Sequence, residues 1–285
     1  MTQQMVQANG VELCVETFGS QADPAVLLIH GAAASMDFWE TPFCERLAAA
    51  GRFVIRYDHR DTGQSVSYEP GKPQYDGMDL AADAIGVLDA LGIARAHVVG
   101  ISMGGGIAQR LVLDHPDRVA SVTFATTSPG GPGGPSNPDL PPASEKIRAA
   151  FSEDAPETDW SDPEAALDAL IDAERLFAGT LPYDEPARRR FNRAMMARTK
   201  NLASAMTNHW ILEGGEPVRQ RLGEIAVPAL VLHGTEDPLF PPGHAEAMAR
   251  EVPGARLVLL EGAGHELPEP TWDVVLREIE AITAS

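Results

Sequence analysis

The stretch VVGISMGGGIAQ, residues 98–109, contains the strongest indication of fold and chemistry in the chain. It places valines typical of a buried strand before Ser102 and three consecutive glycines, Gly104 to Gly106, after it. Glycine in a helix interior costs roughly 0.5–1 kcal/mol relative to alanine, because it has more backbone freedom to lose. A helix that begins with three glycines therefore indicates that the chain needs space around Ser102.

Ser102 lies in the pentapeptide GISMG, residues 100–104, between a predicted strand and a predicted helix. In that setting the Gly-x-Ser-x-Gly pattern is the nucleophile elbow, a turn so tight that the serine backbone is strained and its hydroxyl lies above the sheet. We predict that side chains two positions before and after the serine would collide with it. Gly105 and Gly106 are predicted to let the helix approach neighbouring strands closely. A flexible glycine turn without chemical function is the less favoured alternative.

Short apolar strands alternate with amphipathic helices along most of the chain. Continuous apolar strands between such helices predict the α/β fold class, with a mostly parallel central sheet covered by helices on both faces. The predicted strands fall within residues 11–19, 24–31, 53–60, 96–102, 118–126, 227–237 and 255–265. The predicted helices fall within residues 39–51, 78–92, 103–116 and about 243–252, with one more at the C-terminus.

The alternation is interrupted once. Residues 126–144 are rich in proline and glycine and are not expected to form regular structure, and residues 145–225 contain helical patterns but no convincing strand. A disordered linker followed by a separate helical domain is one interpretation. We favour a helical insertion over one edge of the sheet, because strands resume directly afterwards. This predicts a core of residues 1–130 and 220–285, with residues 131–219 as an inserted helical cap.

A serine hydroxyl is a weak nucleophile and needs a base that is itself oriented by a third group. The order expected after a nucleophile elbow is an acid and then a histidine. Asp237 follows a predicted strand in HGTEDPLFPP, and His265 follows the next one in GAGHELP. Because both lie where parallel strands end, as Ser102 does, we predict a Ser102–His265–Asp237 triad. Glu236 competes for the acid role, but Asp237, next to the proline turn, suits a loop carboxylate better.

The other histidines are predicted to have no catalytic role. His97, His115 and His244 are expected near strand starts or at the surface, His30, His59 and His233 at strand ends, and His209 in the cap.

A tetrahedral intermediate also needs two backbone N–H donors. The Met103 amide, directly after the nucleophile and at the start of the helix, is the first candidate. The second is the Ala32 amide, in the loop HGAAASMDFW, where small side chains at 32–34 would let the backbone approach a substrate oxygen. A merely tight turn is the alternative for that loop.

Composition limits the classes of function. The chain has 285 residues, 44% of them hydrophobic, and a formal net charge of −19, which argues against a nucleic-acid partner. Cys14 and Cys44 are far apart and lack metal-ligand spacing, so we expect buried thiols rather than a disulfide or zinc site. No secretory signal and no transmembrane stretch is evident, which predicts a cytoplasmic protein without membrane association. We expect no metal and no cofactor; the oligomeric state is left open.

Together these motifs resemble the α/β-hydrolase superfamily over essentially the whole chain. The stretches VIRYDHRDTGQS, residues 54–65, and HGTEDPL are more narrowly similar to the branch that contains aclacinomycin methylesterase and related small-molecule esterases. The resemblance implies hydrolysis of a polyketide methyl ester by a Ser–Asp–His triad beneath a helical cap.

The expected activity is therefore that of a serine hydrolase that cleaves a carboxylic ester of a small molecule through an acyl-enzyme. A cofactor-free haloperoxidase or perhydrolase, or a C–C bond hydrolase, would use the same triad. A receptor-type protein that binds a ligand without turnover is a further alternative. Epoxide hydrolases and dehalogenases of this fold need an aspartate at the elbow, which Ser102 excludes.

Overall fold

The computed structural model of the protein describes residues 2–130, 137–152 and 158–284. Its centre is an eight-stranded sheet with the order β1-β2-β4-β3-β5-β6-β7-β8. The β1–β2 and β2–β4 pairs are antiparallel and all other pairs are parallel, which confirms the predicted α/β class. The strands are β1 (Thr2–Ala8), β2 (Val11–Phe18), β3 (Ala25–Ile29), β4 (Phe53–Tyr57), β5 (Ala96–Ile101), β6 (Val119–Ala125), β7 (Ala229–Gly234) and β8 (Arg256–Leu260).

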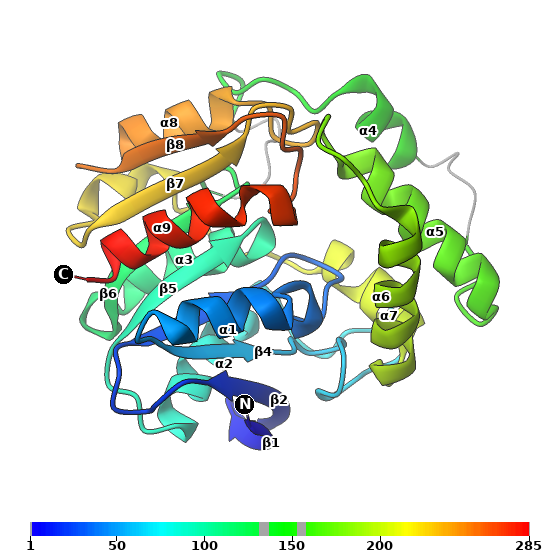
Figure 1. Ribbon diagram of the computed structural model, residues 1–285, viewed down its shortest axis with the longest axis horizontal. Helices are drawn as coiled ribbons and strands as arrows, with labels where there is room; N and C mark the ends of the chain where they lie inside the picture. The colour runs from blue at the N-terminus through cyan, green and yellow to red at the C-terminus, as the bar shows by residue number, and fades with distance from the viewer. Residues whose placement is uncertain (1, 131–136, 153–157, 285) are drawn as a thin grey trace.

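Helices cover both faces of the sheet (Figure 1). Every residue of β3, β4, β5 and β7 is buried, as expected for parallel strands between two helical layers. Helices α2, α3 and α8 pack on one face, and α1 and α9 pack on the other. The helix bounds are α1 (Thr41–Ala49), α2 (Gly77–Ala90), α3 (Met103–Asp114), α8 (Gly243–Glu251) and α9 (Trp272–Ile282).

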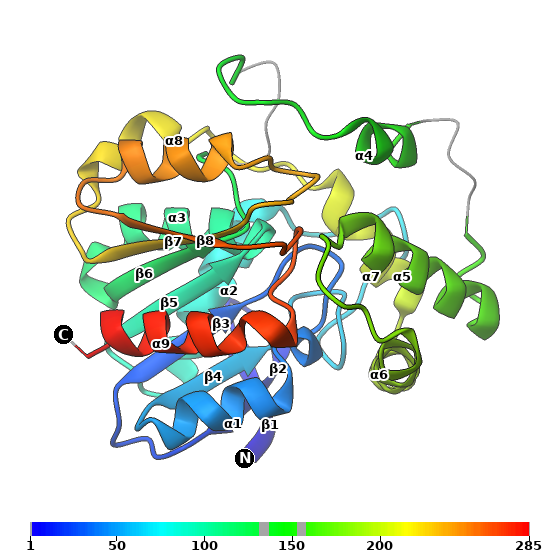
Figure 2. The ribbon, with the colours of Figure 1, turned by 45° about the horizontal axis from the view of Figure 1, so that its top comes forward.

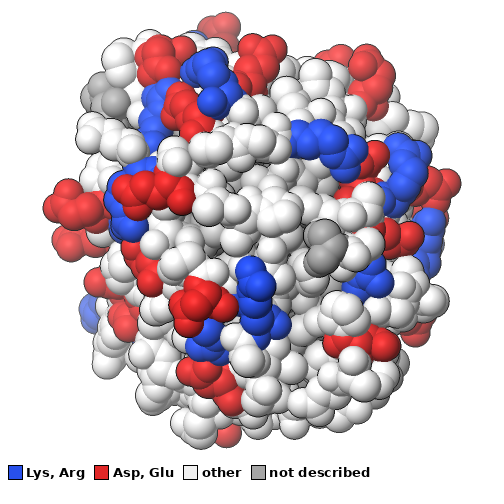
Figure 3. All heavy atoms as spheres, turned by 90° about the vertical axis from the view of Figure 1, so that its left-hand side faces the viewer, with Lys and Arg blue, Asp and Glu red and all other residues white. Residues whose placement is uncertain are grey.

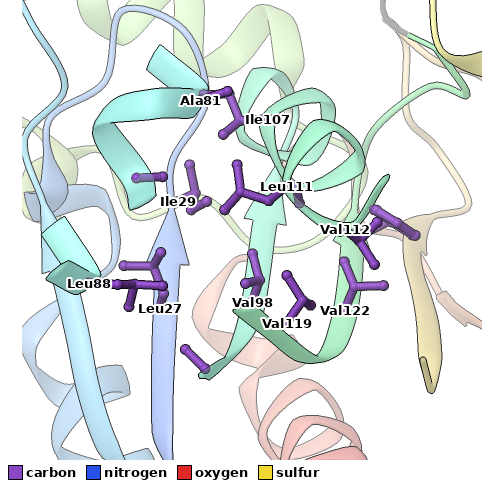
Figure 4. Close-up of a cluster of buried hydrophobic side chains, with 14 of the residues drawn as sticks. Leu27, Ile29, Ala81, Leu88, Val98, Ile107, Leu111, Val112, Val119 and Val122 are labelled. Atoms are coloured by element: carbon purple, nitrogen blue, oxygen red, sulfur yellow. The ribbon is translucent and has the colours of Figure 1, made fainter. Parts of the chain in front are cut away.

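Figure 4 shows how one face of the sheet meets its helices. Leu27 of β3 and Val98 of β5 point toward Leu88 of α2 and Leu111 of α3, and all four side chains are almost completely buried. Burial of one such side chain contributes roughly 1.5–3 kcal/mol relative to exposure. This packing fixes α3 against the strands and therefore fixes the turn that precedes it.

The opposite face uses a stripe of apolar residues on α9. Trp272, Val275, Leu276 and Ile279 are buried and follow the spacing of one side of a helix. The Trp272 ring lies edge-on to Phe43 of α1, with 5.6 Å between ring centroids. The C-terminal helix is therefore part of the core and holds the loop that precedes it.

The segment between β6 and β7 contributes no strand within the part of residues 145–225 that the structure describes, as the sequence predicts. Figures 1 and 2 place the helices within residues 145–207 beyond the ends toward which the parallel strands run, whereas the 3₁₀ helix at residues 219–224 lies near the C-terminal end of α3. Within the proline- and glycine-rich stretch 126–144, residues 131–136 lie outside the described residues, and the others form neither helix nor strand. The elements are α4 (Glu145–Ala150), α5 (Pro163–Phe177), α6 (Glu185–Arg198), α7 (Leu202–Thr207) and the 3₁₀ helices η3 (Asn208–Ile211) and η4 (Arg219–Glu224).

The structure bears on the cysteines, the surface charge and the membrane-spanning potential of the chain. Cys14 and Cys44 are buried free thiols, and burial raises the pKa of Cys14 to about 11. On the face in Figure 3, acidic and basic side chains are interspersed, so this face has no charge of a single sign. No helix in the described ranges is long and apolar enough to cross a membrane. β1, most of whose side chains are exposed, lies outside the predicted strands.

Candidate active site

Ser102 occupies the single position between β5 and α3. Its backbone has φ +55° and ψ −118°, a strained conformation for a residue with a side chain, which costs on the order of 1–3 kcal/mol. The Ser102 N–H donates to the Ala125 carbonyl at 3.0 Å. The Ser102 carbonyl accepts from the Thr127 hydroxyl at 2.8 Å and from the Gly105 and Gly106 amides at 2.9 and 3.2 Å. The turn therefore has the strain that the motif predicts.

Gly100 and Gly104 lack side chains for a reason other than the predicted collision with Ser102. A Cβ at Gly100 would overlap the carbonyl of Gly104, and a Cβ at Gly104 would overlap the carbonyl of Ile29 in β3. The backbone of the helix and of a neighbouring strand, rather than the serine, therefore excludes side chains here. At Gly105 a Cβ would lie 2.6 Å from the Cβ of Thr127, which fits the predicted close approach. The same prediction is wrong for Gly106, where an added Cβ meets nothing within 4 Å.

This difference gives a matched pair of variants on one helix. Gly106→Ala is expected to increase the free energy of unfolding by about 0.5–1 kcal/mol, because alanine loses less backbone freedom and finds open space. Gly104→Ala is expected to decrease it by about 1–3 kcal/mol, because the new methyl group overlaps backbone that cannot move freely. Urea unfolding of both variants measures the two effects. Equal effects of the two substitutions would contradict the packing described.

The structure brings Ser102, His265 and Asp237 together, although 163 residues separate the first two in the chain. The distance from Ser102 Oγ to His265 Nε2 is 2.9 Å, and that from His265 Nδ1 to Asp237 Oδ2 is 2.8 Å. The His265 side chain is 9% exposed and that of Asp237 is fully buried. A neutral imidazole that donates from Nδ1 to the carboxylate presents Nε2 as the acceptor for the serine hydroxyl.

Asp237 is held by donors on all sides. Its Oδ1 accepts hydrogen bonds from the Leu239 and Phe240 amides at 2.9 and 2.8 Å. The Nε2 of His233, which donates to the Phe240 carbonyl, lies 3.4 Å from Oδ2. Burial by itself would raise the pKa of Asp237, but His265, His233 and the amide donors hold it below its usual value. The carboxylate is therefore ionised in the folded protein at neutral pH. Glu236, its competitor in the sequence, is exposed.

Of the two amides predicted to bind an oxyanion, that of Met103 directly follows Ser102, and that of Ala32 belongs to a loop that passes next to the serine. Met103 begins α3, so its N–H has no acceptor within the helix. The backbone of Gly31, which precedes Ala32, passes so close to the serine that a Cβ there would lie 3.2 Å from Ser102 Cβ and 3.6 Å from Oγ. Within the described part of the chain, neither the Ala32 nor the Met103 amide donates a hydrogen bond.

The segment after α5 touches the His265 loop directly. The His265 N–H donates to the Phe177 carbonyl at 2.8 Å, and the Thr180 N–H donates to the Gly262 carbonyl at 2.8 Å. A Cβ at Gly179 would overlap the Gly262 carbonyl, so the two segments are in backbone contact. The sequence contains no signal for this contact, because it joins segments about 85 residues apart whose only shared feature is glycine.

Two aromatic rings pack against His265. Phe177 and Phe240 lie on it with ring centroids at 5.6 and 5.3 Å. The ring centroid of Phe151 lies 6.3 Å from that of Phe177 and 5.4 Å from that of Trp210. Phe151 and Trp210 are about half exposed. Apolar side chains therefore extend from the imidazole to the surface of the segment between β6 and β7.

Two other histidines have contacts that the sequence does not predict. His244, expected at the surface or near a strand start, is buried at the beginning of α8 and lies 2.9 Å from the Ser128 hydroxyl. His209, from the inserted segment, contacts the loop that carries Ala32. The sequence predicts no catalytic role for His209, since a single histidine in a helical segment carries no pattern.

Comparisons with known proteins identify the family of this fold. Residues 24–269 match the family model described as the alpha/beta hydrolase fold. The chain is 36% identical to rhodomycin D methylesterase DauP of Streptomyces sp. (strain C5), over 94% of this chain and 93% of that protein. It is 35% identical to rhodomycin D methylesterase DnrP of Streptomyces peucetius, with the same coverage.

Among solved structures, the enol-lactonase from Burkholderia xenovorans LB400 is similar, with a TM-score of 0.76 and 26% identity, covering 99% of this chain and 100% of that one. The family model spans most of the chain, including the nucleophile elbow and the loops of Asp237 and His265. The protein therefore belongs to the alpha/beta hydrolase fold family.

Proposed function

We propose that this carboxylic ester hydrolase acts on a small-molecule ester, with a methyl ester as the preferred class, through an acyl-enzyme on Ser102. The observation that carries the proposal is the continuous set of hydrogen bonds from Ser102 through His265 to Asp237. The methyl ester is supported by the similarity to two rhodomycin D methylesterases over 94% of the chain.

In the first half of the reaction, Ser102 Oγ attacks the ester carbonyl while His265 Nε2 accepts the hydroxyl proton. Asp237 stabilises the imidazolium that forms and keeps its Nδ1 proton in place. The amides of Ala32 and Met103 donate to the oxygen that becomes negative. The intermediate then breaks the bond to the alcohol oxygen, which takes the proton from His265 and leaves as the alcohol.

In the second half, a water molecule replaces the alcohol. His265 removes a proton from the water as its oxygen attacks the acyl carbon, and the same two amides hold the second oxyanion. The bond to Ser102 Oγ breaks, the serine recovers its proton from His265, and the carboxylic acid leaves. The net reaction converts the ester and one water molecule into the carboxylic acid and the alcohol.

We further propose that residues 131–219 act as a cap on a core of residues 1–130 and 220–285. Ion pairs between α6 and the core support this division into a core and an attached cap. Arg198 pairs with Asp58 at 2.6 Å and with Asp37 at 2.9 Å, and Arg188 pairs with Glu40 at 2.9 Å. The aromatic side chains near His265 would give this cap an apolar surface toward the substrate.

The proposal is tested with methyl, ethyl and butyl esters of one aryl carboxylic acid, with release of the acid followed by chromatography. Hydrolysis of all three, with the highest kcat/KM for the methyl ester, is expected. Stopped-flow measurement with p-nitrophenyl butyrate is expected to give at most one equivalent of rapid p-nitrophenol release per enzyme if deacylation is slower than acylation. No release of acid from any ester would overturn the proposal, whereas equal rates would remove only the preference for methyl esters.

A further inference from the structure

Three histidines hold the loop after β3: His59 and His209 are buried, and His30 is half-buried. The Gly31 N–H donates to His30 Nδ1 at 2.7 Å, and His59 Nε2 lies 3.0 Å from the His30 carbonyl. The Ala33 N–H donates to His209 Nδ1 at 3.0 Å. Of the three histidines, His30 and His59 belong to the core loops, and His209 alone comes from the inserted segment.

Ala33 is in a conformation that needs such support. Its φ is +59°, a left-handed value that costs roughly 1–2 kcal/mol for a residue with a Cβ. The only hydrogen bond of its N–H within the described part of the chain is the one to His209 Nδ1. Without that acceptor, this half-buried N–H would have no partner within the described part of the chain, and the backbone at Ala33 would be free to relax. Since Ala32 directly precedes Ala33, a change there would also turn the Ala32 peptide.

The tautomer of His209 is defined by its second partner. His209 Nε2 lies 2.8 Å from the Arg60 carbonyl, so Nε2 carries the proton and donates it, and Nδ1 is free to accept. Burial, with a further effect of His59, lowers the pKa of His209 to about 4. The ring is therefore neutral at physiological pH, which the acceptor role at Nδ1 requires.

The ring also has little freedom to turn. The side chain is 6% exposed and lies edge-on to His59 and Tyr75, with centroids at 5.8 and 6.4 Å. The neighbouring residue Asn208 donates to Asp61 Oδ2 at 2.8 Å and accepts from the Gly71 N–H at 2.7 Å. These contacts attach η3 to the core and thereby fix the position of His209 beside the loop that carries Ala33.

We propose that His209 is a positioning residue for ester hydrolysis: by accepting the Ala33 N–H, it keeps the Ala32 amide directed at the oxygen of the tetrahedral intermediate. The inserted segment thereby takes part in forming the reaction centre as well as covering it. This inference rests on the proposed function, and specifically on the proposed role of the Ala32 amide.

Three substitutions separate the two hydrogen bonds of the ring. His209→Asn places an amide oxygen where Nδ1 was and can still accept from Ala33. His209→Gln can replace the donor toward Arg60 but has no acceptor at the Nδ1 position. His209→Phe keeps a ring of similar size without either group. For each variant, kcat and KM are measured with the methyl ester, and the melting temperature is measured without substrate.

We expect kcat to fall about 10- to 100-fold in the Gln and Phe variants with KM changed less than about 3-fold, since an oxyanion donor acts in the transition state. The Asn variant is expected to retain kcat within about 3-fold of wild type, even where its melting temperature falls as far as that of the Gln variant. Equal kcat in the Asn and Gln variants, or losses that simply follow melting temperature, would overturn the positioning role while leaving the ester hydrolase proposal intact. If the wild-type protein hydrolyses no ester, both proposals are rejected.

Discussion

Replacing Ser102 with alanine is expected to lower kcat for ester hydrolysis by about 10⁴- to 10⁶-fold, with residual hydrolysis due to the oxyanion donors alone. The substitution removes the oxygen that lies 2.9 Å from His265 Nε2, so no acyl-enzyme can form. Alanine is smaller than serine and needs the same strained backbone, so the fold is expected to persist. Steady-state hydrolysis of p-nitrophenyl butyrate, with single-turnover measurement for the slow variant, gives the ratio.

A matched control is available in the same sheet. Ser121 in β6 is buried and its hydroxyl lies 2.8 Å from the Nδ1 of His97, so it forms a serine–histidine pair remote from the elbow. Ser121→Ala is expected to keep kcat within about 2-fold of wild type. If Ser102→Ala retained most of the activity, Ser102 would not be the nucleophile and the proposed mechanism would be wrong.

Asp237→Asn is expected to lower kcat by about 10⁴-fold, because it moves the ring proton of His265 from Nδ1 to Nε2. The amides of Leu239 and Phe240 both donate to Oδ1, so the asparagine must direct its carbonyl oxygen toward them. Its NH₂ group then faces His265 Nδ1, which becomes an acceptor. The imidazole proton moves to Nε2, where the ring can no longer take the proton of Ser102.

The neighbouring carboxylate provides the comparison for this variant. Glu236 is exposed and directly precedes Asp237, so Glu236→Gln removes an equal charge at the neighbouring position. This variant is expected to keep kcat within about 2-fold of wild type. Heteronuclear NMR of the His265 ring in Asp237→Asn is expected to show the Nε2-protonated tautomer. An Asp237→Asn variant with nearly full activity would show that another group orients His265.

Much of the fold follows from local patterns. Apolar runs such as those of β3 and β5 predict buried parallel strands, because a strand covered on both faces has no polar side. The spacing around Ser102 predicts a strained turn, and the structure has it. The antiparallel strand β1 is not predicted, because most of its side chains are exposed and its place at the edge depends on pairing with β2.

The surroundings of the three glycines at the start of α3 cannot be predicted from the sequence. Three adjacent glycines in α3 look alike in the sequence, yet Gly104 lies against the backbone of β3, Gly105 lies against Thr127, and Gly106 faces open space. The distance between a helix and its neighbours depends on how the layers pack. A run of identical residues cannot by itself indicate which of them that packing requires.

The sequence by itself determined the α/β class, the order of Ser102, Asp237 and His265, and the helix start at Met103, because each depends on periodicity or on residues adjacent in the chain. Only the tertiary structure decided the contacts of the inserted segment: Phe177 with His265, and His209 with Ala33, 176 residues away. The physical reason is that each of these hydrogen bonds uses at least one backbone group, which every residue possesses. Their partners are therefore selected by where packing places the chain, and no residue type marks them beforehand.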